Sequence, residues 1–139
     1  MKQSVSMNWL GDMAFQTSLN GHKITIDASE EHGGKDLGPR PKSLMLVALG
    51  GCTGMDVVSI LKKMRVEYNS LEVVVEGDLA EEHPKKFLHM KIYYNFTGNN
   101  LPLDKIQKAV DMSREKYCGV AANYKESMEI DHIINILPA

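Results

Sequence analysis

The sequence predicts a single α+β domain over residues 1–139, and three observations indicate this class. First, a helical pattern covers residues 41–64 and carries no charged residue between positions 43 and 55. Second, alternating apolar residues predict strands on both sides of that helix. Third, the expected order β-β-β-α-β-β-α-β has too few long helices to cover both faces of a large sheet. A chain of 139 residues is also long enough to bury a core of its own.

The N-terminal part is predicted to form a small antiparallel sheet. Residues 4–19 alternate roughly between apolar and polar types, and a Gly-Asp pair at 11–12 divides them into two strands. Asn-Gly at 20–21 is a strong hairpin signal, so residues 22–27 are expected to form the third strand. Residues 28–40 are rich in glycine and charge, which predicts an irregular loop.

Residues 41–64 are predicted to form one long central helix that carries Cys52. Its second half repeats apolar residues at i, i+3, i+4 and i+7, namely Val57, Ile60, Leu61 and Met64. Its first half is apolar all round, so we expect it to be buried in a core or an interface. The uncharged run is shorter than the roughly 20 residues of a membrane span. Glycines beside Cys52 cost about 1 kcal/mol each relative to alanine, which predicts a backbone passing close by.

The remaining elements follow from alternation and turn residues. Residues 71–82 and 87–96 predict a long antiparallel hairpin, and a second helix is expected over 102–116. A break and a short further helix are expected around Cys118, and residues 127–137 predict the last strand. On the second strand of the hairpin, one face is expected to hold Leu88, Met90, Ile92 and Tyr94.

Composition excludes several functional classes. The formal net charge is −2 and the basic residues are scattered, so no nucleic-acid partner is expected. The N-terminus lacks the apolar segment of a signal peptide, so we expect a cytoplasmic protein with reduced thiols. Two cysteines are too few for a disulfide framework or a Cys-rich zinc site. A metal site built from Glu30, Glu31, His32 and Asp36 is disfavoured, because charged loop residues are usually just solvated.

The two cysteines are the candidates for chemistry. Cys52 lies among apolar helical residues, where a thiol stays inert unless a cation or a hydrogen-bond donor reaches it. Cys118 is expected near the start of a helical turn, where the helix dipole lowers the pKa of a thiol. If the fold brings the sulfurs together, one thiolate can attack a peroxide and the other can close a disulfide on the sulfenic acid. Spacing alone leaves two inert thiols equally open.

Two segments resemble a known family. They are PRPKSLMLVALGGCTGMDVVSILKKMR at 39–65 and SREKYCGVAANY at 113–124. Both are similar to motifs of the OsmC/Ohr family, the osmotically inducible and organic hydroperoxide resistance proteins. The resemblance covers nearly the whole chain and includes the GGKDLGPRP loop at 33–41 and the order of elements. Two cysteine motifs in the right order make it specific.

This resemblance implies an OsmC-like fold in an intertwined homodimer with the long helices at its centre. It also implies a hydroperoxide reductase of the oxidative stress response, an antioxidant with peroxiredoxin-like chemistry. Cys52 takes the position of the attacking cysteine and Cys118 that of the resolving one. No bound cofactor or metal is implied, and the reductant is a dithiol, in some members a lipoylated protein.

The chain departs from the peroxidase pattern in two respects. Peroxidase members stabilise the thiolate with an arginine from the N-terminal strands, which pairs with a glutamate early in the long helix. Here no arginine precedes Arg40, and Lys42 and Ser43 stand in place of the glutamate. Arg40 and Lys42 are therefore the candidates for stabilising the thiolate. The alternative is an OsmC-like dimer with little or no turnover that senses redox state or binds a small molecule.

Overall fold

The computed structural model describes all residues, 1–139. The chain forms two compact units, Met1–Met45 and Leu46–Ala139, which are described separately. The long helix α1 (Pro41–Lys63) begins in the first unit and continues through the second. Its bounds agree with the predicted helix over 41–64, because the proline suits a first helical turn and Lys62 and Lys63 suit the last one.

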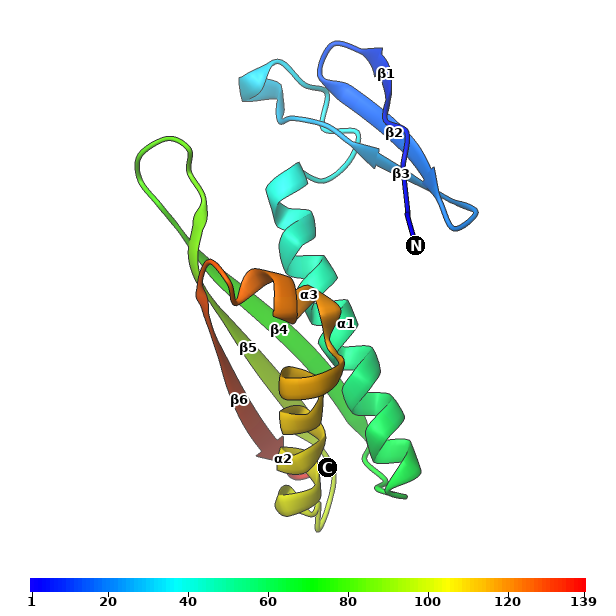
Figure 1. Cartoon of the computed structure of the whole chain (residues 1–139), viewed down its shortest axis with the longest axis vertical. Coiled ribbons are helices and arrows are strands. Elements are labelled where there is room, and N and C mark those ends of the chain that lie inside the picture. Colours follow the sequence, from blue (N-terminus) through cyan, green and yellow to red (C-terminus); the bar gives the residue numbers. More distant parts are fainter. The chain divides into compact units, whose positions relative to one another are not determined.

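The first unit contains a three-stranded antiparallel sheet in the order β1-β2-β3 (Figure 1). Its strands are β1 (Asn8–Gly11), β2 (Ala14–Leu19) and β3 (His22–Ile26). The predicted hairpin is confirmed, since Asn20 and Gly21 both have positive φ, 52° and 81°.

The loop after β3 is organised by the buried side chain of Asp27. Its carboxylate accepts backbone N–H groups from Ala28 at 2.7 Å, Lys35 at 3.1 Å and Leu37 at 3.2 Å. Burial acts to raise the pKa of Asp27, but these hydrogen bonds outweigh it and the pKa is lowered. The loop predicted to be irregular is therefore held in one conformation, with a single 3₁₀ turn, η1 (Glu30–His32).

The second unit contains a sheet in the order β4-β5-β6, with α1 and α2 side by side on one face (Figure 1). Its strands are β4 (Ser70–Leu79), β5 (Phe87–Thr97) and β6 (Glu129–Leu137). β4 and β5 form the predicted antiparallel hairpin, whereas β6 pairs with β5 in parallel. A parallel partner needs a crossover connection, which here consists of α2 (Leu103–Met112), a π turn η2 (Ser113–Tyr117) and α3 (Gly119–Tyr124).

The core of this unit lies between the central strand β5 and the helices. Fully buried side chains come from all three elements: Met90, Ile92, Tyr94 and Phe96 from β5, Leu49, Val57 and Leu61 from α1, and Ile106, Ala109 and Val110 from α2. The prediction was wrong for Leu88, which is 52% exposed. Asp78 pairs with His89 and Leu79 with Phe87, so Leu88 is the extra residue of a β-bulge.

In the single chain, helix α1 is buried along only part of its surface. In the single chain Val47 is 66% exposed, and Met55 and Val58 are also exposed. By length and composition the helix could cross a membrane, but core helices of soluble proteins meet the same criterion. Gly50 and Gly54 approach valine side chains of β4 rather than backbone: a Cβ on Gly50 would lie 3.0 Å from Val75 Cγ2. A Cβ on Gly51 would meet nothing within 4 Å.

Candidate functional site

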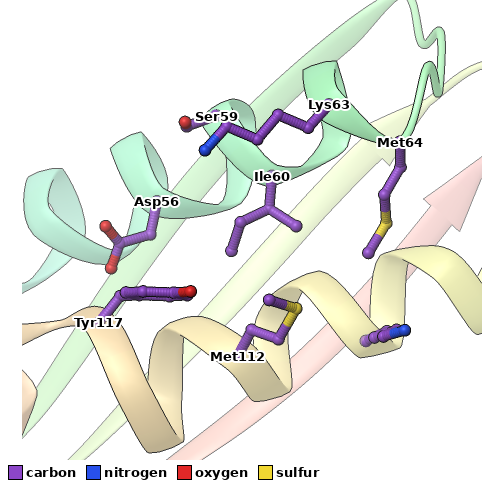
Figure 2. Close-up of a pocket in the computed structure, with 8 residues that line it drawn as sticks. Asp56, Ser59, Ile60, Lys63, Met64, Met112 and Tyr117 are labelled. Carbon is purple, nitrogen blue, oxygen red and sulfur yellow. The ribbon is translucent and has the colours of Figure 1, made fainter.

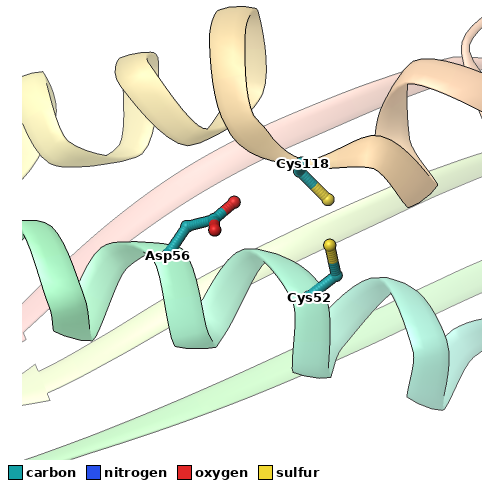
Figure 3. A group of neighbouring side chains, drawn as sticks. All are labelled: Cys52, Asp56 and Cys118. Atoms are coloured by element: carbon teal, nitrogen blue, oxygen red, sulfur yellow. The ribbon is translucent and has the colours of Figure 1, made fainter.

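The two cysteines and one carboxylate converge in the second unit (Figure 3). The thiol sulfurs of Cys52 and Cys118 and a carboxylate oxygen of Asp56 all lie within 4.8 Å of one another. Cys52 and Asp56 are four residues apart on α1, so they share one face of the helix. Figure 3 shows the sulfur of Cys118 pointing toward that of Cys52 from the segment that precedes α3. The proximity expected of a redox pair is present.

A widened helical turn places Cys118. The backbone N–H of Cys118 donates to the carbonyl of Ser113 at 2.8 Å, the i to i−5 bond of the π turn. Such π turns are frequent at functional sites. The chain then becomes extended at Cys118, and the N–H of Ala121 donates to its sulfur at 3.3 Å. The predicted break between two helices therefore lies at the cysteine itself.

The two thiols have different surroundings. Cys118 is buried with 3% exposure, whereas Cys52 is partly exposed. Burial, and next the hydrogen bond with Cys52, raise the pKa of Cys118 to about 11, although the Ala121 N–H acts to lower it. The expectation that a helix start lowers the pKa of Cys118 was therefore wrong, because burial disfavours the charged thiolate more strongly.

A chain of hydrogen bonds runs from Asp56 into the core of the second unit. Ser113 Oγ donates to Asp56 Oδ2 at 2.8 Å and lies 3.1 Å from Thr53 Oγ1. Thr53 Oγ1 lies 2.7 Å from the Tyr94 hydroxyl, which in turn lies 2.9 Å from His132 Nδ1. Three elements besides α1 are thus tied to the carboxylate beside the cysteines.

The direction of this relay follows from one proton per hydroxyl group. Ser113 donates to Asp56, so it must accept from Thr53, and Thr53 must then accept from Tyr94. Tyr94 therefore accepts from His132, whose Nδ1 carries the proton. Burial raises the pKa of Tyr94 to about 12 and lowers that of His132 to about 4, so the phenol keeps its proton and the imidazole is neutral near pH 7.

Sequence reasoning missed Asp56 and the relay. The Cys52-x-x-x-Asp56 spacing could have identified the carboxylate, since residues four apart face the same way on a helix. The hydroxyl partners could not be found in this way, because Thr53 meets Tyr94 and Ser113 across 41 and 60 positions of sequence. His132 is partly buried and ends the relay.

The other candidates lie in the first unit. The guanidinium of Arg40 bonds the Asp36 carboxylate at 2.5 Å and the Gly38 carbonyl at 2.9 Å. Lys42 lies at the beginning of α1. Of the loop set considered for a metal, Asp36 is thus paired with Arg40, and His32 Nδ1 lies 2.9 Å from Ser29 Oγ.

A cavity of about 380 Å³ adjoins the cysteine cluster through Asp56 (Figure 2). Figure 2 shows Asp56 and Tyr117 at one end, and Ile60, Met64 and Met112 further along. The complete lining is Asp56, Ser59, Ile60, Lys63, Met64, Lys108, Met112 and Tyr117. The cavity combines a carboxylate at one end with walls of mixed character, in which apolar and aromatic side chains alternate with two lysines and a serine.

Comparison with known proteins gives consistent matches. A family model described as OsmC-like protein matches residues 33–133. Protein YhfA of Escherichia coli strain K12 is 34% identical over 134 residues, which is 96% of this chain and 97% of that protein.

Solved structures agree over the whole chain. A hypothetical protein from Aquifex aeolicus VF5 is 29% identical with a TM-score of 0.86, and the match covers 100% of this chain and 98% of that one. An organic hydroperoxide resistance protein from Legionella pneumophila, also described as OsmC and as a predicted redox protein, has a TM-score of 0.71 at 12% identity, with 97% of each chain covered. The latter likeness concerns the fold alone.

Proposed function

Because this chain belongs to the family of OsmC-like proteins, we propose that it is a cysteine-based thiol peroxidase that reduces organic hydroperoxides. The observation that carries the proposal is that the sulfur atoms of Cys52 and Cys118 lie within 4.8 Å of each other. Structural neighbours described as organic hydroperoxide resistance proteins support it through their common fold. The family expected from the two cysteine motifs is confirmed.

The reaction begins with the Cys52 sulfur attacking the terminal oxygen of the hydroperoxide. An S–O bond forms as the O–O bond breaks, and the alkoxide leaves and takes a proton to become an alcohol. Cys52 is then a sulfenic acid. The sulfur of the Cys118 thiol attacks the Cys52 sulfur, the S–O bond breaks, and the thiol proton joins the leaving hydroxide, so that a disulfide and water are formed. A dithiol reductant, such as a lipoylated protein, restores both thiols by exchange and becomes a disulfide itself.

The roles of the two cysteines follow from their surroundings. Cys52 is partly exposed and can meet a substrate, whereas Cys118 is buried and has a raised pKa. The adjoining cavity offers Ile60, Met64 and Met112 to an alkyl chain, and its Asp56 end lies beside the thiols. We assign attack to Cys52 and resolution to Cys118. Arg40 and Lys42 remain the proposed sources of positive charge for the thiolate.

We also propose that the whole chain is one OsmC-like domain that acts as a cytoplasmic homodimer. The family match over 33–133 includes parts of both compact units, which supports a single domain. The dimer is supported by the apolar side chains that α1 exposes in the single chain, Val47, Met55 and Val58.

A second candidate is an OsmC-like dimer with little turnover that senses redox state or binds a small molecule. The departure at Arg40 favours it, since no arginine precedes this residue and its guanidinium is already bound by Asp36. Such a protein would keep the thiol pair and the cavity without rapid catalysis.

One experiment separates the two candidates. Reduced protein receives one equivalent of cumene hydroperoxide, and free thiols are counted before a dithiol is added for steady-state turnover. A peroxidase loses both thiols rapidly and turns over with the dithiol. Loss of thiols without turnover supports the sensor, and thiols that persist contradict both forms of the redox proposal.

A further inference from the structure

We propose that Cys52, Asp56 and Cys118 form a binding site for a thiophilic divalent cation of the Zn²⁺ class. The sequence expectation of no metal site considered only Cys-rich sites and a charged loop. The fold adds a carboxylate to the two thiols, and together they make a set of one oxygen and two sulfur donors. Thiolate and carboxylate are both established zinc ligands.

The spacing of the donors suits one ion. Zinc binds sulfur at about 2.3 Å and carboxylate oxygen at about 2.0–2.2 Å. Tetrahedral geometry then places neighbouring donors about 3.5–3.8 Å apart. The three donor atoms already lie within 4.8 Å of one another, so small side-chain adjustments are enough. Three protein ligands leave the fourth position of a tetrahedral ion for water.

The surroundings fix the carboxylate as metal sites require. Ligating carboxylates are themselves usually hydrogen-bonded, which orients them. Here Ser113 Oγ donates to Asp56 Oδ2, and Ser113 is held by Thr53 at the end of the buried relay. The two donors on α1 lie on one helix face, and Cys118 is held by a π turn. Two of the ligands are thus presented by one helix, and the third lies in the extended residue between η2 and α3.

Binding and oxidation exclude each other at this site. The cation displaces the proton from each thiol it binds, and the protons pass to the solvent. A Cys52–Cys118 disulfide has no thiolate to offer, so only the reduced protein can bind. A bound cation in turn occupies the sulfurs that a peroxide would attack. The metal site itself does not depend on the proposed peroxidase activity.

The test is a cobalt titration of the full-length reduced protein without oxygen. Co²⁺ replaces zinc in such sites, and thiolate ligation gives a sulfur-to-cobalt charge-transfer band. We expect this band to saturate at one equivalent per chain and to disappear when Zn²⁺ is added. Protein oxidised to the disulfide should show no band, and this control needs no substitution.

Variants test each ligand. Cys52→Ser and Cys118→Ser should weaken Co²⁺ binding at least tenfold, and so should Asp56→Asn. Asp111→Asn is the matched control, because it makes the same charge change on α2, where the carboxylate accepts from Gln107. Circular dichroism shows whether each variant is folded. If a cysteine variant does not fold, wild-type protein whose thiols are blocked with iodoacetamide is titrated in its place.

Two results would overturn the site. One is the absence of a charge-transfer band in reduced wild-type protein. The other is equal Co²⁺ affinity in Asp56→Asn and Asp111→Asn, which would remove the carboxylate from the ligand set. Peroxide consumption is measured separately on metal-free protein, so a failed peroxidase assay leaves a positive cobalt titration standing, and the reverse also holds.

Discussion

At the scale of single residues, the two sulfurs lie close together but in different environments, and the roles proposed for them rest on this difference. Cys118 is buried with a pKa raised to about 11, while Cys52 is partly exposed. Cys52→Ser should therefore abolish peroxide consumption. Cys118→Ser should allow one fast turnover and then accumulate a Cys52 sulfenic acid. Mass spectrometry after a stoichiometric peroxide pulse checks this, and a sulfenic acid on Cys118 with Cys52 untouched would reverse the assignment.

His132 gives the second prediction at this scale, a pH dependence of stability. Burial lowers its pKa to about 4 from an ordinary value of 6.5. Between these two pH values His132 is protonated in the unfolded chain but neutral in the folded chain. The free energy of unfolding should therefore fall as pH falls from about 6.5 to about 4. Urea unfolding across this range measures the slope, and His132→Gln should reduce it.

The tautomer of His132 can be measured independently. The relay requires a proton on Nδ1, because Tyr94 already donates to Thr53. Nitrogen-15 NMR distinguishes a protonated Nδ1 from a protonated Nε2 in the neutral ring. A proton on Nε2 near pH 7 would contradict the direction derived for the whole relay.

At the scale of elements, substitution by alanine should affect stability differently at two adjacent glycines of α1. A Cβ on Gly51 meets nothing within 4 Å, so Gly51→Ala should stabilise the isolated chain by up to about 1 kcal/mol through helix propensity. A Cβ on Gly50 meets Val75 Cγ2 at 3.0 Å, so the same gain is offset by crowding. Urea unfolding of both variants compares them. A destabilising Gly51→Ala would indicate that another surface packs there.

Alternation and turn chemistry predicted most elements, since these patterns reflect local geometry. The Asn20-Gly21 hairpin and the helix beginning at Pro41 are read directly from residue types. The bulge at Leu88 was not predictable, because a single extra residue in a strand leaves the apolar pattern almost unchanged. The π turn before Cys118 likewise depends on how the connection fits between β5 and β6.

The site was predictable to a different degree. The two cysteines were identified from their motifs, but the carboxylate beside them was not considered. The proximity of Asp56 to both cysteines depends on the tertiary packing that places Cys118 opposite α1. The relay behind it joins Thr53 to Tyr94 and Ser113 through tertiary packing, and no sequence period encodes such long-range pairs.

At the scale of the whole molecule, the exposed stripe on α1 points to a partner. Val47, Met55 and Val58 lie within one face of the helix, because at 3.6 residues per turn these three positions span only about 80° around its axis. Their exposure in the single chain is 66%, 77% and 43%. An apolar stripe of this kind marks an interaction site, and a second copy of the chain is the occupant that the family suggests.

We therefore predict a stable homodimer that a charge on this stripe would weaken. At micromolar concentration the Met55→Glu variant should contain more monomer than the wild-type protein, because its dimer would have to bury a carboxylate without a partner. Leu103→Glu is the matched control: it is 55% exposed and lies in the first turn of α2, where an acidic residue is favourable. Light scattering coupled to size-exclusion chromatography measures both. A wild-type monomer, or equal dissociation in the two variants, would show that the stripe on α1 is not the dimer interface.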